Sequence, residues 1–272
     1  MTASPRTIPR NYVSYIRDVI KTKRAREREG VFVLEGTRPI LELLQTAPHR
    51  LLSVVVAPSF LDRQSLVIRQ QLLRSGCAVY TCPEERLGQL SDVESPAGAL
   101  AIVRQPIWDQ SIVLAQPKVF GLYGDMLRDP TNMGAIIRTA AGFNVSGLWL
   151  APNSVDVFNP KVVRATAGTL FQLPIFSHTG PEELLALNCM ILASDAGTRG
   201  GTVPIRSIQA MPARTIVAIG SESRGLSEAI LKAAKVRFTI PLAPGVESLN
   251  AAAAAAIALF HLSGVPLESP VA

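Results

Sequence analysis

The sequence has little of what secreted and metal-binding proteins depend on. Of its 272 residues only three are cysteines and three are histidines. An odd number of cysteines without a paired C-x-x-C spacing argues against a disulfide framework or a zinc site. The histidines are scattered and form no H-x-x-x-H pair. We therefore expect no bound metal and a reducing, cytoplasmic setting.

Long apolar runs are also missing. No segment reaches the roughly 18 consecutive apolar residues that a membrane-spanning helix needs. The alanine-rich run from Leu249 comes nearest, but it is short and is closed by His261 and Ser263. The early arginines, Arg6 and Arg10, are not followed by the apolar stretch of a secretory signal. We expect a protein that does not enter a membrane.

Three familiar motifs are absent as well. There is no G-x-G-x-x-G after a strand, which leaves a standard dinucleotide or methyltransferase Rossmann site unsupported. There is no G-x-x-x-x-G-K-[ST] phosphate-binding loop and no G-x-S-x-G nucleophile elbow. No acidic cluster suits a metal ion.

What the chain does contain is an alternation of apolar strands and helices. It is 48% hydrophobic and long enough for one large or two medium domains. In its first part the predicted strands are 31–36, 51–58, 77–82 and 99–106, and the predicted helices are 11–29, 38–47, 61–74 and 83–90. This alternation is typical of an α/β layer domain. We predict a disordered leader over 1–10, a small α/β domain over 11–105 and a linker over 106–117.

The second part, 118–272, repeats the rhythm more strictly. Predicted strands are 118–124, 147–152, 189–195, 214–220 and 236–241, and predicted helices are 132–143, 159–171, 181–187, 227–235 and the run after Asn250. Short apolar strands bounded by glycine and proline indicate a parallel sheet buried on both faces. Ligands of such sheets bind beyond the carboxyl ends of the strands. Three loops at strand ends are unusually polar: 125–134, 220–226 and 241–250.

The first two loops each have two readings. In the first, Asn132 is a candidate helix cap, and the helix start together with Arg138 favours an anion site; alternatively this is a capped helix with a surface arginine. In the second, Glu222 lies between Gly220 and Gly225, where it could hold a cation or fix backbone donors. The alternative is a glycine-rich turn with a solvated glutamate.

The third loop leads into the alanine helix. Pro241, Pro244 and Gly245 bar regular structure, and Ser248 or Asn250 is the candidate cap of the helix that follows. An alanine helix is thin, so another backbone can approach it closely. The alternative is an ordinary terminal helix.

In order and near this spacing, the three loops resemble the motifs of a known enzyme family. N-x-G-A-I-x-R-T-A, G-x-E-x-x-G-L-S and I-P-L-x-x-x-x-E-S-L-N-A-A are similar to those of the SpoU/TrmH family of RNA ribose 2′-O-methyltransferases, in the SPOUT superfamily. The resemblance covers about 118–264 and includes 159–174. The N-terminal part resembles a small RNA-binding α/β domain related to a ribosomal protein. The resemblance implies a SPOUT domain with a parallel sheet and a deep trefoil knot, plus the smaller N-terminal domain.

The resemblance also implies a cofactor and its site. The family binds S-adenosyl-L-methionine bent among the three loops, mostly through backbone contacts. The cofactor-binding residues implied here are Ile219, Gly220, Glu222, Gly225, Ile240, Pro241, Ser248 and Leu249. Family members are usually homodimers that pair through this domain.

The implied catalytic residues are Arg138, Asn132, Glu222, Ser248 and Asn250. Family proposals give the arginine a base-like role, but a free guanidinium stays protonated well above neutral pH. We therefore expect Arg138 to grip the adjacent phosphate and stabilise the developing alkoxide, with the other four positioning it, the ribose and the cofactor.

Charge points to a polyanionic partner. The formal net charge is +6 and the sequence pI is about 9.5. We expect RNA contacts from the basic segment and from the arginine of the first loop, that is Lys21, Lys23, Arg24, Arg26, Arg28 and Arg138. A solvated helix face is the alternative for the segment.

The accessory domain favours ribosomal RNA, 23S in particular, over tRNA as the substrate. The alternatives are a tRNA ribose methyltransferase, a base methyltransferase of another SPOUT branch, and a non-catalytic RNA-binding or ribosome-assembly factor.

Overall fold

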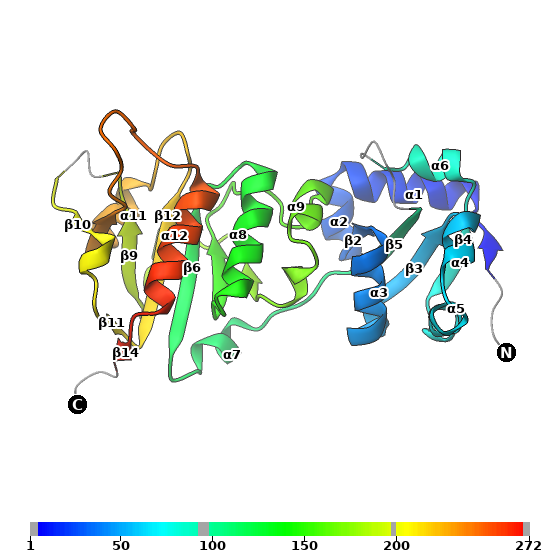
Figure 1. Cartoon of the computed structure of the whole chain (residues 1–272), viewed down its shortest axis with the longest axis horizontal. Coiled ribbons are helices and arrows are strands. Elements are labelled where there is room, and N and C mark those ends of the chain that lie inside the picture. Colours follow the sequence, from blue (N-terminus) through cyan, green and yellow to red (C-terminus); the bar gives the residue numbers. More distant parts are fainter. Residues whose placement is uncertain (1–4, 92–97, 197–199, 269–272) are drawn as a thin grey trace. The chain divides into compact units, whose positions relative to one another are not determined.

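The structure, a computed structural model, describes residues 5–91, 98–196 and 200–268. The chain forms two compact units (Figure 1). The first is Met1–Pro106 together with Phe158–Gly168, and the second is Ile107–Val157 together with Thr169–Ala272. No helix in the described residues is both long enough and apolar enough to span a membrane.

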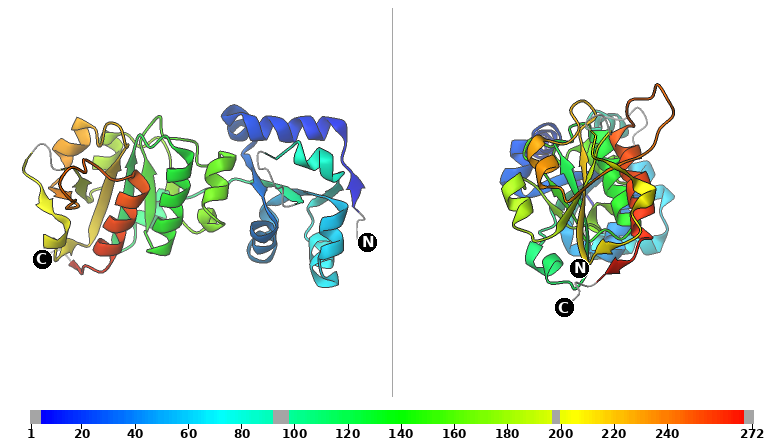
Figure 2. Two further views of the ribbon diagram at one scale, coloured as in Figure 1. Left: turned by 45° about the horizontal axis from the view of Figure 1, so that its top comes forward. Right: turned by 90° about the vertical axis from the view of Figure 1, so that its left-hand side faces the viewer.

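The first unit is built on a five-stranded mixed sheet in the order β1-β4-β3-β5-β2. Its strands are β1 Arg6–Thr7, β2 Val31–Glu35, β3 Leu51–Val56, β4 Ala78–Thr81 and β5 Ala99–Arg104. Its helices are α1 Arg10–Lys21, α2 Lys23–Glu29, α3 Thr37–Thr46, α4 Pro58–Arg63, α5 Leu66–Arg74 and α6 Glu84–Gly88. β5 runs antiparallel to both its neighbours, while β1, β4 and β3 are parallel. α1 packs on one face of the sheet, and α3, α4 and α5 lie on the other (Figure 2).

Two helices predicted as continuous are each broken in the first unit. The 11–29 helix stops at Thr22, which is extended with φ −121° and caps α2 by accepting from the Ala25 amide. The 61–74 helix divides at Gln64, and Ser65 caps α5. Gly30 ends α2 in the left-handed region at φ 62°, as its sequence position indicates.

The predicted disordered leader needs correction. Arg6 and Thr7 form β1, which pairs in parallel with Tyr80 and Thr81 of β4. Residues 1–4 of that leader lie outside the described residues. A two-residue strand is too short to show a periodicity in the sequence. It forms only because it pairs with the edge of a sheet made from distant residues.

The second unit contains a seven-stranded sheet in which every pair is parallel, as predicted. In sheet order the strands are β10 Val203–Pro204, β13 Val236–Thr239, β9 Met190–Ser194, β12 Arg214–Gly220, β6 Val119–Asp125, β7 Gly147–Leu150 and β8 Ile175–Phe176. Its helices are α7 Gln110–Leu114, α8 Pro130–Gly142, α10 Pro181–Leu185, α11 Glu228–Ala233 and α12 Ala251–Ser263. A separate pair joins β11 Met211–Pro212 to β14 Leu267–Glu268. β6, the neighbour of the central strand β12, is buried along its whole length.

Helices cover both faces of this sheet. α8 and α12 lie side by side on one face, in green and red in Figures 1 and 2. The buried positions of α12 include Ala251, Ala255 and Ala258, whose small side chains allow a close approach. α7, α10 and α11 contribute Val113, Leu184 and Ile230 to the core cluster that contains Tyr123, Trp149 and Ile191.

The segment predicted as a linker contains a short helix. Asp109 caps α7, and Val113 is buried in the second unit. The Trp149 indole donates to Gln110 Oε1 at 2.8 Å, and Arg214 donates to the Leu114 carbonyl at 2.8 Å. The glutamines and prolines of this segment suggested a linker. The segment is packed because its partners, Trp149 and Arg214, are far away in the sequence.

The segment around α9, Pro160–Ala165, was predicted within the second domain and packs with the first unit instead. Phe158 packs on Phe32 with ring centroids 5.2 Å apart, and Arg164 forms an ion pair with Glu35 at 3.4 Å. The helix is also shorter than the predicted 159–171, because Ala167 has a positive φ of 51°.

Candidate active site

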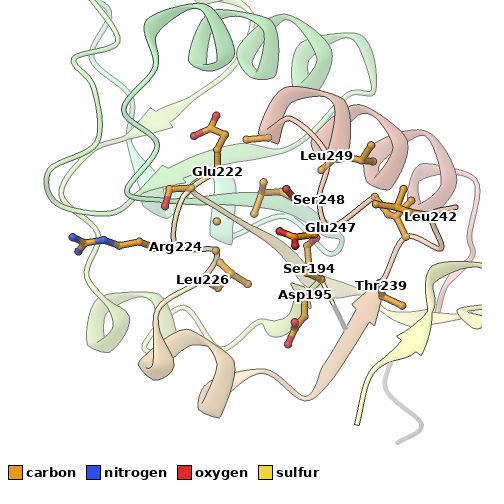
Figure 3. A pocket seen from close by; sticks show the side chains of 18 of the residues that line it. Ser194, Asp195, Glu222, Arg224, Leu226, Thr239, Leu242, Glu247, Ser248 and Leu249 are labelled. Atoms are coloured by element: carbon orange, nitrogen blue, oxygen red, sulfur yellow. The ribbon is translucent and has the colours of Figure 1, made fainter. Parts of the chain in front are cut away.

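A cavity of about 430 Å³ opens at the carboxyl end of the second sheet (Figure 3). Its walls come from the ends of β9, β12 and β13, from the second and third polar loops, and from the first turn of α12. All eight residues expected to bind the cofactor line it: Ile219, Gly220, Glu222, Gly225, Ile240, Pro241, Ser248 and Leu249. Two loops that are separate in sequence therefore form one site.

The second loop is a tight turn that depends on its glycines. Ser221 and Gly225 exchange backbone hydrogen bonds of 3.2 and 2.8 Å. Gly225 has φ +66°, and a Cβ on Gly220 would lie 2.1 Å from the Gly225 carbonyl carbon. A side chain at Gly220 would therefore force the turn open, and with it one wall of the cavity.

The third loop reverses at Gly245, whose φ is +87°. Asn250 caps α12, because its Oδ1 accepts from the Ala252 amide at 2.9 Å and from the Ala253 amide at 3.3 Å. Ser248 lines the cavity. Of the two residues that the sequence offered as caps, Asn250 holds the helix and Ser248 faces the site.

Three of the expected catalytic residues form a chain of side-chain hydrogen bonds. Asn132 Nδ2 donates to Glu222 Oε1, and Asn250 Nδ2 donates to Asn132 Oδ1 at 2.9 Å. Asn132 was the predicted cap of α8, but the cap is Asp129, whose Oδ1 accepts from the Asn132 amide at 2.7 Å. The chain ties the start of α8 to the second loop and to the start of α12.

Arg138 lies apart from this chain. It is exposed on α8, about 9 Å along the helix axis from Asn132. It does not line the cavity. In the residues that the structure describes, Arg138 forms no hydrogen bond or ion pair, so within one chain it is free to meet a partner.

The cavity is acidic although the protein is basic. Asp195, Glu222 and Glu247 line it together with Arg224, and Figure 3 shows the Arg224 side chain extending away from the other labelled residues. Asp195 is paired with Arg237 at 2.7 Å, which leaves two carboxylates against an outward-pointing arginine. This balance favours a ligand that carries positive charge over one that carries phosphates.

Several lining residues escaped the sequence reading. Ser194 and Asp195 lie at the carboxyl end of β9, and Thr239 ends β13. The sequence of 189–195 could have indicated them, because its apolar run ends in the polar pair Ser194 and Asp195. The rule that ligands bind at such strand ends applied to this strand as well.

Asp125 was also missed. This residue is only 3% exposed and lies at the end of β6, paired in register with Gly220. Its Oδ2 accepts from the Ser227 amide at 2.7 Å and so anchors the far end of the second loop. Two residues earlier on β6, Tyr123 donates to the Thr179 carbonyl at 3.2 Å, and burial raises the pKa of its phenol, which stays neutral.

One expected RNA contact in the first unit needs correction. Lys21, Lys23, Arg24 and Arg28 are exposed. Arg26 is only 3% exposed, and its Nη1 donates to the Val19 and Ile20 carbonyls at 2.7 and 2.9 Å. It therefore satisfies the carboxyl end of α1 and is unavailable to RNA.

The described residues contain no cluster of three or more histidine, cysteine, aspartate or glutamate side chains placed to hold a metal ion.

Comparison with known proteins assigns both parts of the chain. Residues 120–260, more than half of it, match the SpoU rRNA Methylase family, and 11–101 match the MRM3-like substrate binding domain. An uncharacterized tRNA/rRNA methyltransferase of Synechocystis is 31% identical over 92% of this chain and 89% of its own length. The 23S rRNA (guanosine(2553)-2′-O)-methyltransferase RlmP of Bacillus subtilis is 26% identical over 90% of this chain and 93% of its own.

The fold matches as well. The crystal structure of the SpoU methyltransferase AviRb from Streptomyces viridochromogenes, in complex with the cofactor AdoMet, superposes with a TM-score of 0.81. It is 25% identical in sequence, over 94% of this chain and 97% of that one. The family resemblance read from the three loops is confirmed, and the chain belongs to the SpoU rRNA methylase family.

Proposed function

We propose that this protein transfers a methyl group from S-adenosyl-L-methionine to a ribose 2′-hydroxyl of RNA, and that its substrate is 23S ribosomal RNA. The observation that carries the proposal is the acidic cavity formed by the second and third motifs at the carboxyl end of the parallel sheet. Family membership and the name of the Bacillus relative support the reaction and the RNA class.

The residues of the cavity fit this cofactor. A volume of about 430 Å³ suits a ligand of the size of S-adenosyl-L-methionine. The negative charges of Glu222 and Glu247 would attract its positively charged sulfonium. Backbone groups of the 219–220, 240–241 and 248–249 stretches would hold the adenosine part. When bound, the cofactor supplies a methyl group already activated by the sulfonium.

In this reaction the S–CH3 bond would break as the O–CH3 bond forms, and the hydroxyl proton would leave to water. The protein must therefore align the ribose oxygen behind the methyl group and leave that proton a path to solvent. We propose that Arg138 binds the phosphate next to the target ribose and stabilises the alkoxide that develops. Ser248, at the cavity wall, positions the ribose. Asn132, Glu222 and Asn250 already satisfy one another, so they keep the loops in register and position the other groups indirectly.

We propose that the active protein is a homodimer. Phe260 is 72% exposed and Ile257 41% exposed on α12, and the Phe260 ring meets Phe143, at the end of α8, edge to face with centroids 6.1 Å apart. This is an apolar surface on the two helices that carry motifs one and three. A partner there would bring a second α8 to the site, which gives the free Arg138 a role across the interface.

We also propose that the C-terminal domain carries the deep trefoil knot and that the protein works in the cytoplasm. Support for the knot comes from the non-sequential strand order and from the third loop, which walls the same cavity as the second. Such threading is a rare exception among folds.

The reaction is tested with the full chain, radiolabelled S-adenosyl-L-methionine and protein-free bacterial 23S ribosomal RNA. We expect label in the RNA at a linkage that resists alkaline cleavage. Label at an alkali-sensitive linkage would instead identify a base methyltransferase. If calorimetry detects no cofactor binding to the folded protein, the assembly-factor alternative holds.

Arg138 gives a sharper test of the mechanism. We expect Arg138→Ala to lower single-turnover methylation by roughly 100-fold or more, because a preorganised charge aimed at an oxyanion is lost. Cofactor affinity should be unchanged, since Arg138 is outside the cavity. Arg74→Ala, an exposed arginine on α5, is the matched control. Near-normal methylation by Arg138→Ala would remove the proposed role.

A further inference from the structure

One side of α1 carries a line of three basic residues, of which only Lys21 was among the expected RNA contacts. Val13, Ile16 and Val19 are buried against the sheet, so the opposite side of α1 faces solvent. Arg10, Arg17 and Lys21 are all exposed. Their spacings of seven and four residues place them within about 20° of one line along the helix, since each residue turns it by about 100°. We call these three residues the α1 basic stripe.

Among the described residues, no ion pair holds the side chains of the stripe, although Asp18, also exposed on α1, is next to Arg17 in sequence. The stripe extends about 16 Å along the helix. Ser14, which lies between Arg10 and Arg17 on the same side, adds a hydroxyl group.

The neighbouring basic segment of α2 is different. Lys23 is paired with Glu27 at 3.4 Å, and Arg28 with Glu29 at 2.8 Å. Arg26 is buried in the capping contact described above. Of the four cations on α2, only Arg24 is both exposed and without an acidic partner among the described residues. The number of basic residues in α2 therefore overstates the unpaired positive charge that this helix presents to solvent.

We propose that the α1 basic stripe, rather than the charged run of α2, is the main contact of the first unit with the RNA phosphate backbone. Three unpaired cations in a line suit a chain of regularly spaced phosphates, which attract them whatever the base sequence. Long arginine and lysine side chains lose no existing ion pair on contact. This inference rests on the proposed function, because it takes RNA as the substrate.

The test compares two variants of the full chain that remove the same charge. One is Arg10→Gln, Arg17→Gln, Lys21→Gln. The control is Lys23→Gln, Arg28→Gln, Arg74→Gln, in which two residues come from the paired run and one from α5 on the other face of the sheet. Binding to protein-free 23S ribosomal RNA is measured over a range of KCl concentrations. Calorimetry with S-adenosyl-L-methionine and thermal unfolding verify that the fold is intact.

For the stripe variant we expect RNA affinity to fall about tenfold or more at low salt. The slope of log K against log salt should decrease by about 2 to 3, because each lost phosphate contact removes about 0.7–0.9. The control should keep a slope close to that of the unaltered protein. Equal slopes for the two variants would overturn the stripe while leaving the methyltransferase intact. If the unaltered protein binds the cofactor but no RNA, the proposed substrate fails, and the stripe with it.

Discussion

At the scale of single residues, a chain of side-chain hydrogen bonds joins Asn132, Glu222 and Asn250, one residue from each of the three polar loops. Asn132 and Asn250 were both expected among the catalytic residues; their side chains hydrogen-bond to each other, and neither is among the residues that line the cavity. The expected cap of α8 was Asn132, but Asp129 takes that position. Asp129 precedes Pro130, which occupies the first helical position and has no amide hydrogen to satisfy. The Asn132 side chain is thereby released to join Glu222 and Asn250, residues about 90 and 118 positions away.

Gly220 is the residue whose replacement should damage the cavity most directly. We expect Gly220→Ala to weaken S-adenosyl-L-methionine binding at least tenfold, about 1.4 kcal/mol, because the new Cβ would meet the Gly225 carbonyl carbon at 2.1 Å. Isothermal titration calorimetry measures the change.

The control is Gly142→Ala, at the exposed end of α8, where a Cβ would meet nothing within 4 Å. Its cofactor affinity should match that of the unaltered protein. Tight binding by Gly220→Ala would show that the turn opens without distorting the site.

At the scale of helices and strands, local pattern located the elements and missed the breaks inside them. The apolar spacing of 11–29 continues through Thr22, so periodicity alone shows one helix. The break becomes stable because Arg26 folds back and donates to the Val19 and Ile20 carbonyls at the end of α1. A buried arginine in a basic run looks like any other basic residue until the chain has folded.

The corner between α1 and α2 should therefore depend on one guanidinium. We expect Arg26→Met to lower the free energy of unfolding by about 2–3 kcal/mol, because buried carbonyls lose a charged donor. Urea unfolding of the full chain followed by circular dichroism measures this loss.

Arg24→Met, on the exposed side of the same helix, should change stability by less than about 0.5 kcal/mol. Equal stability of the two variants would mean that water replaces the Arg26 contacts without cost.

At the scale of the whole molecule, the chain passes between its two units at three places, not one. Residues 158–168 leave the second unit and pack with the first, where Phe158 and Arg164 contact Phe32 and Glu35. A linear division at 106–117 cannot represent this. The compact units in space therefore differ from a division of the sequence at one point, because side chains pack with neighbours in space wherever these lie in the chain.

The proposed dimer surface gives a prediction at this scale. We expect Phe260→Asp to produce monomers in sedimentation equilibrium and to lower methylation strongly, because a charge would be placed in the apolar surface of α12. Leu66→Asp is matched in exposure, since both side chains are 72% exposed, but Leu66 lies on α5 of the first unit. It should leave the association state unchanged. A dimeric Phe260→Asp protein would move the interface elsewhere.

The sequence by itself determined the alternation of strands and helices, the parallel sheet of the second unit, the three polar loops and the family. These follow from short-range patterns, because apolar runs, glycines and caps act within a few residues. Only the tertiary structure decided which side chains meet: Asn250 with Asn132, Arg26 with the end of α1, and the 158–168 segment with the first unit. These contacts join residues that are far apart in the chain or, for Arg26, bury a charged side chain. Their energies come from burial and geometry that exist only after the sheets have formed.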